Sequence, residues 1–275
     1  MALCQSETDT TIHRKRFNTV IIGSAATYSI TMVSLNELWY KDFDRSSFHF
    51  FNDSKEWKQV DKFGHIYSTY QFSHILSKVF QWTNLSEKKS DWIGTLVGFG
   101  VVSSVEIFDG FSTEYGASAS DLAANAIGSG LYISQKLLWK EVRFHPKYSF
   151  HRTEYPAYNP SLLGKNVFEE IVKDYNGQTY WLSIDMDKFV RFPKWLNLAI
   201  GYGAEEMIYA NDESNIQNGF IPYRQFYLSL DFDLTSISSK SKVVNTLIFL
   251  ANMIKIPGPT IEFSQGKVRG YIMYF

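Results

Sequence analysis

The chain has 275 residues, and its 27 basic and 28 acidic side chains leave a net charge of −1. This length is enough for one large domain or two small ones with a sizeable core. The even charge balance argues against a nucleic-acid partner, which needs a basic surface, and against an acidic disordered tail. Aromatic side chains make up 17% of the sequence. This content fits either a bulky core or a position at a membrane interface, where Tyr and Trp are favoured.

The first residues predict an exported protein. The single cysteine, Cys4, excludes a disulfide bond within the chain. Small residues around it resemble the end of a secretory signal, and we expect the mature chain to start near Gln5. Two alternatives stay open: lipid attachment at Cys4, for which Leu3 is large, and an ordinary cytosolic N-terminus. Residues 1–16 are expected to be a signal remnant followed by a flexible segment. The basic residues at the end of this segment suit an anionic lipid surface.

Residues 17–140 are expected to form a helical domain. Apolar and small residues predict four helices, over 17–38, 61–82, 91–108 and 118–139. The third is the most apolar stretch of the chain, and its Gly94 and Gly98 lie about one turn apart, which lets another helix approach closely. We expect this helix to be buried by the other helices and partly by lipid.

Polar residues within these apolar helices mark the predicted centre of the protein. Ionisable groups placed in this way are costly unless they are paired. The predicted polar core network consists of Asp61, His65, Glu106, Asp109, Asp121 and Asn125. For catalysis the candidates are His65, Asp61 and Glu106, which could act as acids or bases. A divalent metal is the further alternative, with Asp61, His65, Glu106, Asp109 and Asp121 as its candidate ligands.

These residues also have purely structural explanations. Asp61 could be the N-cap of its helix, and Glu106 could mark an exposed helix end. Asp121 could form a capping box with Ser118. His74 lies on the opposite face of the second helix, so we expect it to be a surface or packing residue.

After residue 140 the helical pattern of apolar residues ends. Residues 141–178 are expected to be a connecting segment with a short helix near 162–174, and residues 211–218 a loop. Residues 179–275 form a β-rich region with a helix over 242–254. Alternating apolar and polar residues predict antiparallel strands with one buried face, over 180–189, 195–202, 225–234, 260–264 and 267–275.

The predicted fold class is α+β, with an N-terminal four-helix bundle followed by an antiparallel β-meander with one or two extra helices. Phe275 ends the last strand with an aromatic residue, as in outer-membrane barrels, but five or six strands are fewer than the about eight that such barrels need. We therefore expect the meander to pack against the helices. Four aspartates, Asp185, Asp187, Asp231 and Asp233, could line up as a calcium site, although such residues more often form the solvent-facing side of a sheet.

Three short motifs on consecutive helices resemble a known family. They are Asp61-Lys62-x-x-His65, the acidic Glu106 near a helix end, and Asp121-x-x-x-Asn125-x-x-Gly128. They are similar to the signature of the YfiM-like family of predicted envelope lipoproteins, a domain of unknown function, and to the broader VanZ-like group of four-helix membrane proteins, linked to glycopeptide-antibiotic tolerance. The resemblance covers about residues 17–139, and the later segments 174–181 and 223–227 resemble an extended form of the family. It implies a location in the outer membrane or periplasm of a Gram-negative bacterium, but no reaction.

Two functions of different classes follow. The first is an envelope scaffold or binding module, in which the buried polar network fixes the helical core and a membrane or membrane protein is the partner. The second is a metal- or acid/base-dependent enzyme acting on an envelope lipid or glycan. The sequence has no metalloprotease, nucleophile-elbow or phosphate-binding motif, which favours the scaffold. We expect no cofactor, with a divalent metal as the alternative.

Overall fold

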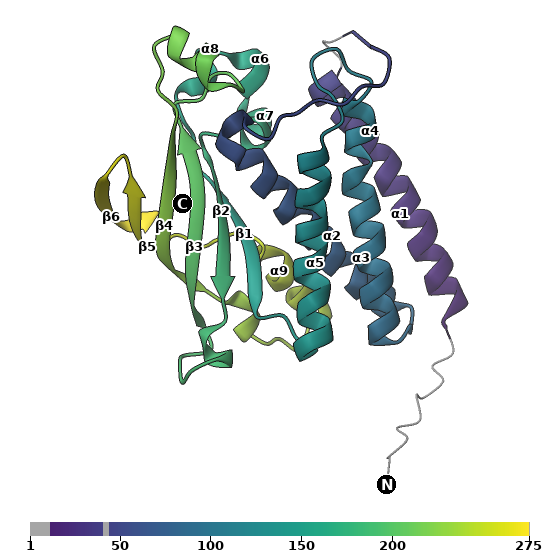
Figure 1. The fold of residues 1–275 in the computed structure, drawn as a ribbon. Helices are drawn as coiled ribbons and strands as arrows, with labels where there is room; N and C mark the ends of the chain where they lie inside the picture. Colours follow the sequence, from purple (N-terminus) through teal and green to yellow (C-terminus); the bar gives the residue numbers. More distant parts are fainter. Residues whose placement is uncertain (1–11, 41–43, 275) are drawn as a thin grey trace.

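The computed structural model describes residues 12–40 and 44–274 of the chain. Helices make up the N-terminal half and a six-stranded antiparallel sheet follows, which confirms the predicted α+β class (Figure 1). Most of the expected signal remnant, and Phe275 at the predicted end of the last strand, lie outside the described residues.

The long helices lie side by side close to the predicted places (Figure 1). They are α1 (Arg14–Leu35), α2 (Val60–Trp82), α3 (Glu87–Ser103) and α5 (Ala119–Trp139). A π-helical turn, Asn36–Tyr40, follows α1, and a short helix, α4 (Val105–Asp109), follows α3. The third predicted helix is therefore interrupted at Ser104, whose hydroxyl donates a hydrogen bond to the Val101 carbonyl at 2.7 Å and competes with the helical ladder.

Helix α2 is central because small residues let two other helices approach it. A Cβ atom added to Gly94 of α3 would lie 2.3 Å from the backbone nitrogen of Ser77 in α2. A Cβ on Gly128 of α5 would lie 2.3 Å from the carbonyl oxygen of Ile66. Both distances are far below a van der Waals contact, so these crossings require glycine. The small-residue face predicted on the third helix is confirmed.

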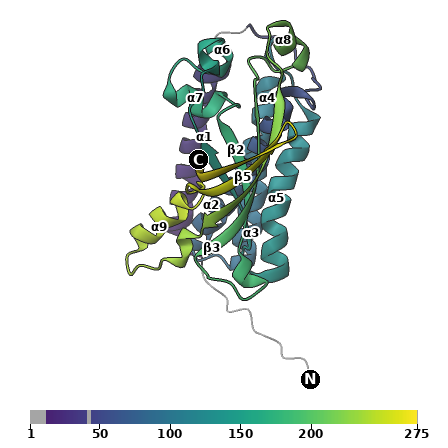
Figure 2. The ribbon, with the colours of Figure 1, turned by 90° about the vertical axis from the view of Figure 1, so that its left-hand side faces the viewer.

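The sheet has the strand order β1-β2-β3-β4-β5-β6, with every neighbouring pair antiparallel. Its strands are β1 (Phe144–Phe150), β2 (Gln178–Ile184), β3 (Leu196–Glu205), β4 (Tyr223–Phe232), β5 (Gly258–Ser264) and β6 (Lys267–Tyr274). Short helices occupy the connections: α6 (Pro160–Leu163), α7 (Val167–Lys173), α8 (Asp212–Gln217) and α9 (Lys242–Ala251). The sheet lies beside α2, and α9 projects to one side of it (Figure 2).

Several element predictions need correction. Strand β1 was not predicted, because Pro146 and Lys147 obscure its alternation. The predicted loop 211–218 contains α8, which begins where the Asn211 side chain accepts a hydrogen bond from the backbone N–H of Ser214. The strand predicted over 180–189 ends at Ile184, and the helix predicted over 242–254 ends at Ala251.

The sheet buries its polar face, which reverses the usual arrangement of alternating strands. Its buried side carries Lys147, Ser149, Thr179, Trp181, Ser183, Asn197, Gln225, Tyr227, Ser229, Asp231, Thr260 and Glu262. Most of the apolar residues that alternate with them are half-buried or exposed, and Ile200, Phe226 and Leu228 are 55%, 51% and 44% exposed, whereas Tyr202, which stacks on Phe63 of α2, is buried. Two of the four aspartates that were expected to face solvent are therefore on the inside: Asp185 is 6% exposed and Asp231 is fully buried, whereas Asp187 and Asp233 are half-buried.

Strong curling of the sheet explains this reversal. Tyr274 of β6 reaches back to β2, where its ring packs 6.1 Å from that of Trp181. On the other side, the segment after α9 pairs with the free edge of β1: Tyr148 donates to the Met253 carbonyl and Lys255 donates to the Tyr148 carbonyl. The polar side chains therefore line the concave side of the sheet, where several hydrogen-bond to one another, whereas the apolar residues lie on the other side.

Replacing Gly128 should separate α5 from α2. The Gly128→Ala variant has no room for its Cβ against the Ile66 carbonyl, so we expect a loss of about 1–3 kcal/mol in the free energy of unfolding. Gly130→Ala is the matched control, because nothing lies within 4 Å of its added Cβ, and it should stabilise α5 by about 0.5–1 kcal/mol. Chemical unfolding of both variants measures the difference, and equal effects would show that this crossing is not tightly packed.

Candidate functional site

The polar residues predicted from the helices meet at one end of the helical half. Asp61 and His65 lie in the first turns of α2, Glu106 and Asp109 in α4, and Asp121 and Asn125 in the first turns of α5. Ser118 begins α5 as its N-cap and accepts a hydrogen bond from the backbone N–H of Asp121, which is one half of the predicted capping box; the Asp121 side chain does not make the other half. The backbone N–H of Ser118 in turn donates to Glu106 Oε2 at 2.9 Å and orients that carboxyl group.

Lys62 is the centre of one half of this cluster. Its ammonium nitrogen lies 2.7 Å from Asp53 Oδ2, 2.9 Å from Asp61 Oδ2 and 2.7 Å from Asp121 Oδ1. Its side chain is 10% exposed, so the three ion pairs are shielded from water. Asp53 also accepts hydrogen bonds from the hydroxyls of Ser118 and Ser120, at 2.6 and 2.7 Å. One cation thus holds together the loop before α2, the start of α2 and the start of α5.

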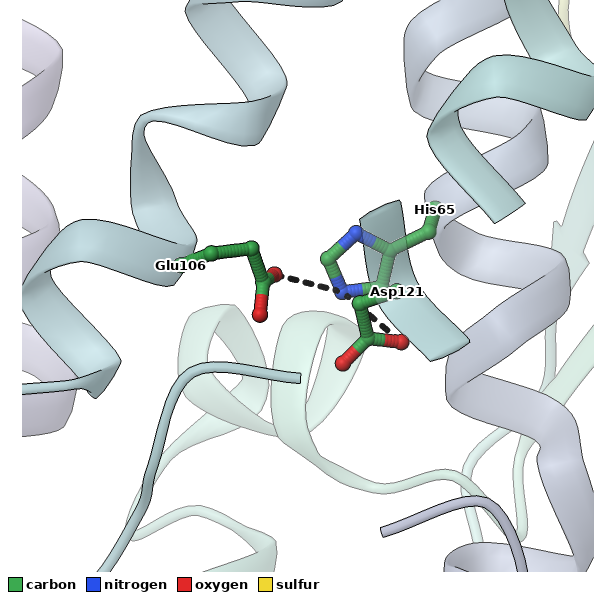
Figure 3. Close-up of side chains that lie close together, drawn as sticks. All are labelled: His65, Glu106 and Asp121. Carbon is green, nitrogen blue, oxygen red and sulfur yellow. Dashed lines mark ion pairs between the residues drawn. The ribbon is translucent and has the colours of Figure 1, made fainter. Parts of the chain in front are cut away.

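His65 is the centre of the other half, where its imidazole faces two carboxyl groups (Figure 3). His65 Nε2 lies 3.9 Å from Glu106 Oε1 and 3.7 Å from Asp121 Oδ1. Its other ring nitrogen, Nδ1, lies 3.1 Å from Asn125 Oδ1, which also accepts a hydrogen bond from Thr69. An amide oxygen can only accept hydrogen bonds, so Nδ1 donates to Asn125 and Nε2 faces the two carboxyl groups.

Burial and the local charges change the acidity of the Lys62 half of the cluster. Burial raises the pKa of Asp61 to about 6, although Lys62 acts in the opposite direction. Burial also raises the pKa of Asp121. For Asp53, burial alone would raise the pKa, but its contacts with Asp121, Lys62 and Ser118 outweigh this and lower it to about 2. Burial alone would lower the pKa of Lys62, but Asp61 and Asp121 more than compensate and raise it.

The structure assigns some predicted residues a different role. The N-cap position of α2 is Gln59, not Asp61, and the Asp61 carboxyl group pairs with Lys62 instead. Glu106 is 3% exposed, which excludes an exposed helix end. Asp109 lies apart from the Lys62 ion pairs, where the Tyr40 hydroxyl donates a hydrogen bond to it at 2.6 Å. His74 is a packing residue, as expected, with its ring 4.8 Å from that of Phe249.

Sequence reasoning missed Asp53, and it named Lys62 without assigning it a role. Asp53 lies in a connection without a helical pattern, so no periodicity points to it. The position of this connection is set by three residues with left-handed backbone, Trp57, Lys58 and Gln59, whose φ values are 47°, 49° and 67°. Such strained residues need support from the rest of the structure. Arg224 of β4 supplies part of it by donating to Gln59 Oε1 at 2.6 Å.

The suggested calcium site in the sheet is wrong. Asp231 lies 2.7 Å from Lys147 Nζ, and both side chains are fully buried. Asp185 contacts His145 Nε2 at 3.0 Å and accepts a hydrogen bond from the Asn197 amide at 2.8 Å. These carboxyl groups have protein partners and do not converge on a common point.

Residues 49–136 match the model of a family described as a predicted periplasmic lipoprotein (DUF2279). The match begins near Asp53 and ends in α5, so it covers the polar cluster but neither α1 nor the sheet. It agrees with the predicted localisation, and the protein is an envelope protein. No curated protein matches the chain, and no solved structure matches it.

Removing the Lys62 charge should destabilise the protein strongly. In Lys62→Met, three buried carboxyl groups lose their shared cation, and breaking a buried ion pair from one side costs about 3–5 kcal/mol. Thermal unfolding at pH 7 should show this loss, and lowering the pH to 5 should restore part of it because the carboxyl groups can then be protonated. Lys58→Met is the matched control, since its partner Asp212 is exposed. Equal losses in the two variants would contradict a central role for Lys62.

Asp61 should give the protein a pH-dependent stability. Its pKa is raised in the folded state, so between about pH 4 and 6 the folded protein keeps a proton that the unfolded chain has released. Stability should therefore fall as pH rises through this window and level off above it. Asp61→Asn should remove this part of the slope, whereas Asp187→Asn, far from the cluster, should keep it. Chemical unfolding at several pH values measures the slopes, and identical profiles for wild type and Asp61→Asn would refute the assignment.

Proposed function

We propose that this protein is an envelope scaffold or binding module that is seated in lipid through an apolar belt. Its buried polar cluster fixes the helical core, and a membrane or a membrane protein is its partner. The proposal includes a relationship of the helical half to YfiM-like proteins and to VanZ-like four-helix membrane proteins. The observation that carries it is the reversed sheet, whose polar residues are inside and whose apolar residues are outside.

The apolar side of the sheet forms a continuous surface across three strands. Ile200 of β3 is paired with Leu228 of β4, and Leu228 is paired with Ile261 of β5. A second row runs through Phe226 and Phe263, which are 51% and 44% exposed. Large exposed apolar surfaces of this kind are uncommon on proteins surrounded by water and indicate a partner or a membrane.

The helices add to the same belt. The stretch Glu87–Asp109, which comprises α3 and α4, is long and apolar enough to cross a membrane, and only 33% of its apolar window is buried. On the neighbouring helices, Ile22 of α1 and Leu138 of α5 are 69% and 71% exposed. A core helix of a water-soluble protein would have most of this surface covered by protein. Contact with lipid accounts for it because lipid chains satisfy apolar side chains without a packed protein partner.

Charge and aromatic residues at one end of the belt suit a lipid headgroup layer. This is the end at which α1 begins and α2 and α5 finish (Figure 1). Its exposed basic residues are Arg14, Lys15, Arg16, Lys88, Lys89, Lys140, Arg191 and Lys194. Trp82 and Trp195, at the same end, are 52% and 53% exposed. Basic side chains attract anionic headgroups, and tryptophan favours the boundary between lipid and water.

The scaffold part of the proposal is supported by the Lys62 ion pairs. They connect three chain segments and lie beside the turn that Arg224 ties to the sheet. Lys62 pairs with one oxygen of each of the three carboxyl groups, and a buried network of this kind specifies one arrangement of the elements around it. The enzyme alternative, acting on an envelope lipid or glycan, is favoured by a different observation: His65 Nε2 faces the carboxyl groups of Glu106 and Asp121.

Binding to lipid vesicles tests the proposed seat. The purified full chain, diluted from detergent, should co-sediment with vesicles of phosphatidylethanolamine and phosphatidylglycerol. Leu96→Glu combined with Ile200→Glu places charges on the belt and should lower the bound fraction several-fold. Phe168→Glu is the matched control: Phe168 is 84% exposed but lies in α7, outside the belt, so binding should stay unchanged. A wild-type chain that stays monomeric and soluble without detergent or vesicles would overturn the proposal.

A further inference from the structure

We propose that His65, Glu106 and Asp121 form a binding site for one divalent transition-metal ion of the Zn²⁺ or Mn²⁺ kind. The inference goes beyond the proposed scaffold and does not depend on the lipid seat. One imidazole nitrogen and two carboxylate oxygens are common ligands for these ions. The ligand atoms come from α2, α4 and α5 and lie within 4.8 Å of one another.

The first argument is that three potential ligand atoms face one another at a largely buried place. The Asn125 amide oxygen accepts from His65 Nδ1, so Nε2 faces the space that it shares with the two carboxyl groups. Glu106 is 3% exposed, and its Oε1 atom, which points at His65, has no hydrogen-bond partner among the described residues (Figure 3). Asp121 Oδ1 is already paired with the Lys62 ammonium group at 2.7 Å, so Glu106 Oε1 is the oxygen that lacks a partner here. A buried carboxylate oxygen in this position needs a cation or a proton.

The distances fit a metal ion better than a hydrogen bond. Separations of 3.7 and 3.9 Å from Nε2 to the two oxygens are too long for a direct hydrogen bond. An ion about 2.1 Å from two ligand atoms in tetrahedral geometry holds them about 3.4 Å apart. The two separations from Nε2 would therefore need to shorten by only a few tenths of an ångström. The imidazole already has the second hydrogen bond, from Nδ1 to a protein oxygen, that metal-bound histidines generally make.

A comparison within the same cluster shows why the ion would choose this position. The carboxyl groups of Asp53, Asp61 and Asp121 form a second group that could hold a metal ion. There, however, the Lys62 ammonium group lies within 2.7–2.9 Å of all three and takes the place of a cation. The group of His65, Glu106 and Asp121 has no ammonium group at its centre.

The site is accessible and incompletely coordinated by protein. The His65 side chain is 21% exposed, so an ion can enter from outside. Three protein ligands leave a fourth position for water or for an oxygen of a bound molecule, which is the arrangement of catalytic rather than structural zinc sites. A bound ion would thus provide the enzyme alternative with its reactive centre, whereas the scaffold would gain a further cross-link between three helices.

Metal analysis of the full chain in detergent, with any purification tag removed, tests the site. After EDTA treatment and dialysis, the wild type should bind close to one equivalent of Zn²⁺ or Mn²⁺, measured by calorimetry and elemental analysis. His65→Gln and Glu106→Gln should each weaken binding by at least about tenfold. His145→Gln is the matched control, because His145 pairs with a single carboxyl group, that of Asp185, and it should bind like the wild type. Equal binding by wild type and His65→Gln, or no binding by the wild type, would refute the site.

Two further measurements keep the result interpretable. X-ray absorption at the zinc edge of the wild type should show nitrogen and oxygen ligands with one imidazole, and sulfur ligation or no imidazole would also refute the site, whatever the variants do. Vesicle binding of His65→Gln should equal that of the wild type, since His65 lies outside the belt. Loss of metal with intact vesicle binding would therefore support the site without bearing on the lipid seat.

Discussion

The structure depends on one shared cation, the ammonium group of Lys62, between three carboxyl groups that come from different parts of the chain. Each of these groups would be costly to bury alone, and together they would repel one another. Because Lys62 lies within 2.9 Å of all of them, the loop before α2, the start of α2 and the start of α5 can come together only in one arrangement. Buried ion pairs add little net stability compared with apolar packing, but breaking one from a single side is expensive. Their main effect here is on which arrangement forms.

The same constraint extends to the sheet through the turn before α2. Trp57, Lys58 and Gln59 adopt left-handed backbone conformations that cost free energy. This turn is held in place by Arg224 on β4 and by the hydroxyl of Tyr202 on β3, which donates to the Lys58 carbonyl. The polar cluster, the strained turn and the sheet are therefore connected by a continuous set of contacts.

The sequence predicted the helices better than it predicted what surrounds them. Periodicity located the long helices, and the polar residues within them identified most of the cluster, because an ionisable group in an apolar helix is conspicuous wherever the helix packs. Asp53 was missed since it lies in an irregular connection, and the role of Lys62 was missed because its three partners become neighbours only in the folded chain. Alternation located most of the strands, but it cannot show which face a curled sheet buries. Asp185 and Asp231 were therefore placed on the wrong side.

The reversed sheet and the polar cluster follow from the same physical condition. In water, a sheet buries its apolar side, since exposing that side costs about 25 cal/mol for each Å². Here Lys147 and Asp231 form an ion pair at 2.7 Å inside the sheet, while Phe226 and Leu228 lie outside. The proposed lipid seat would remove the cost of the apolar exterior and make internal pairing of polar groups more valuable, because no water competes for them. Lys62 supplies such a partner to one oxygen of each of its three carboxyl groups, and the proposed metal ion would supply one to the buried Oε1 atom of Glu106 beside His65.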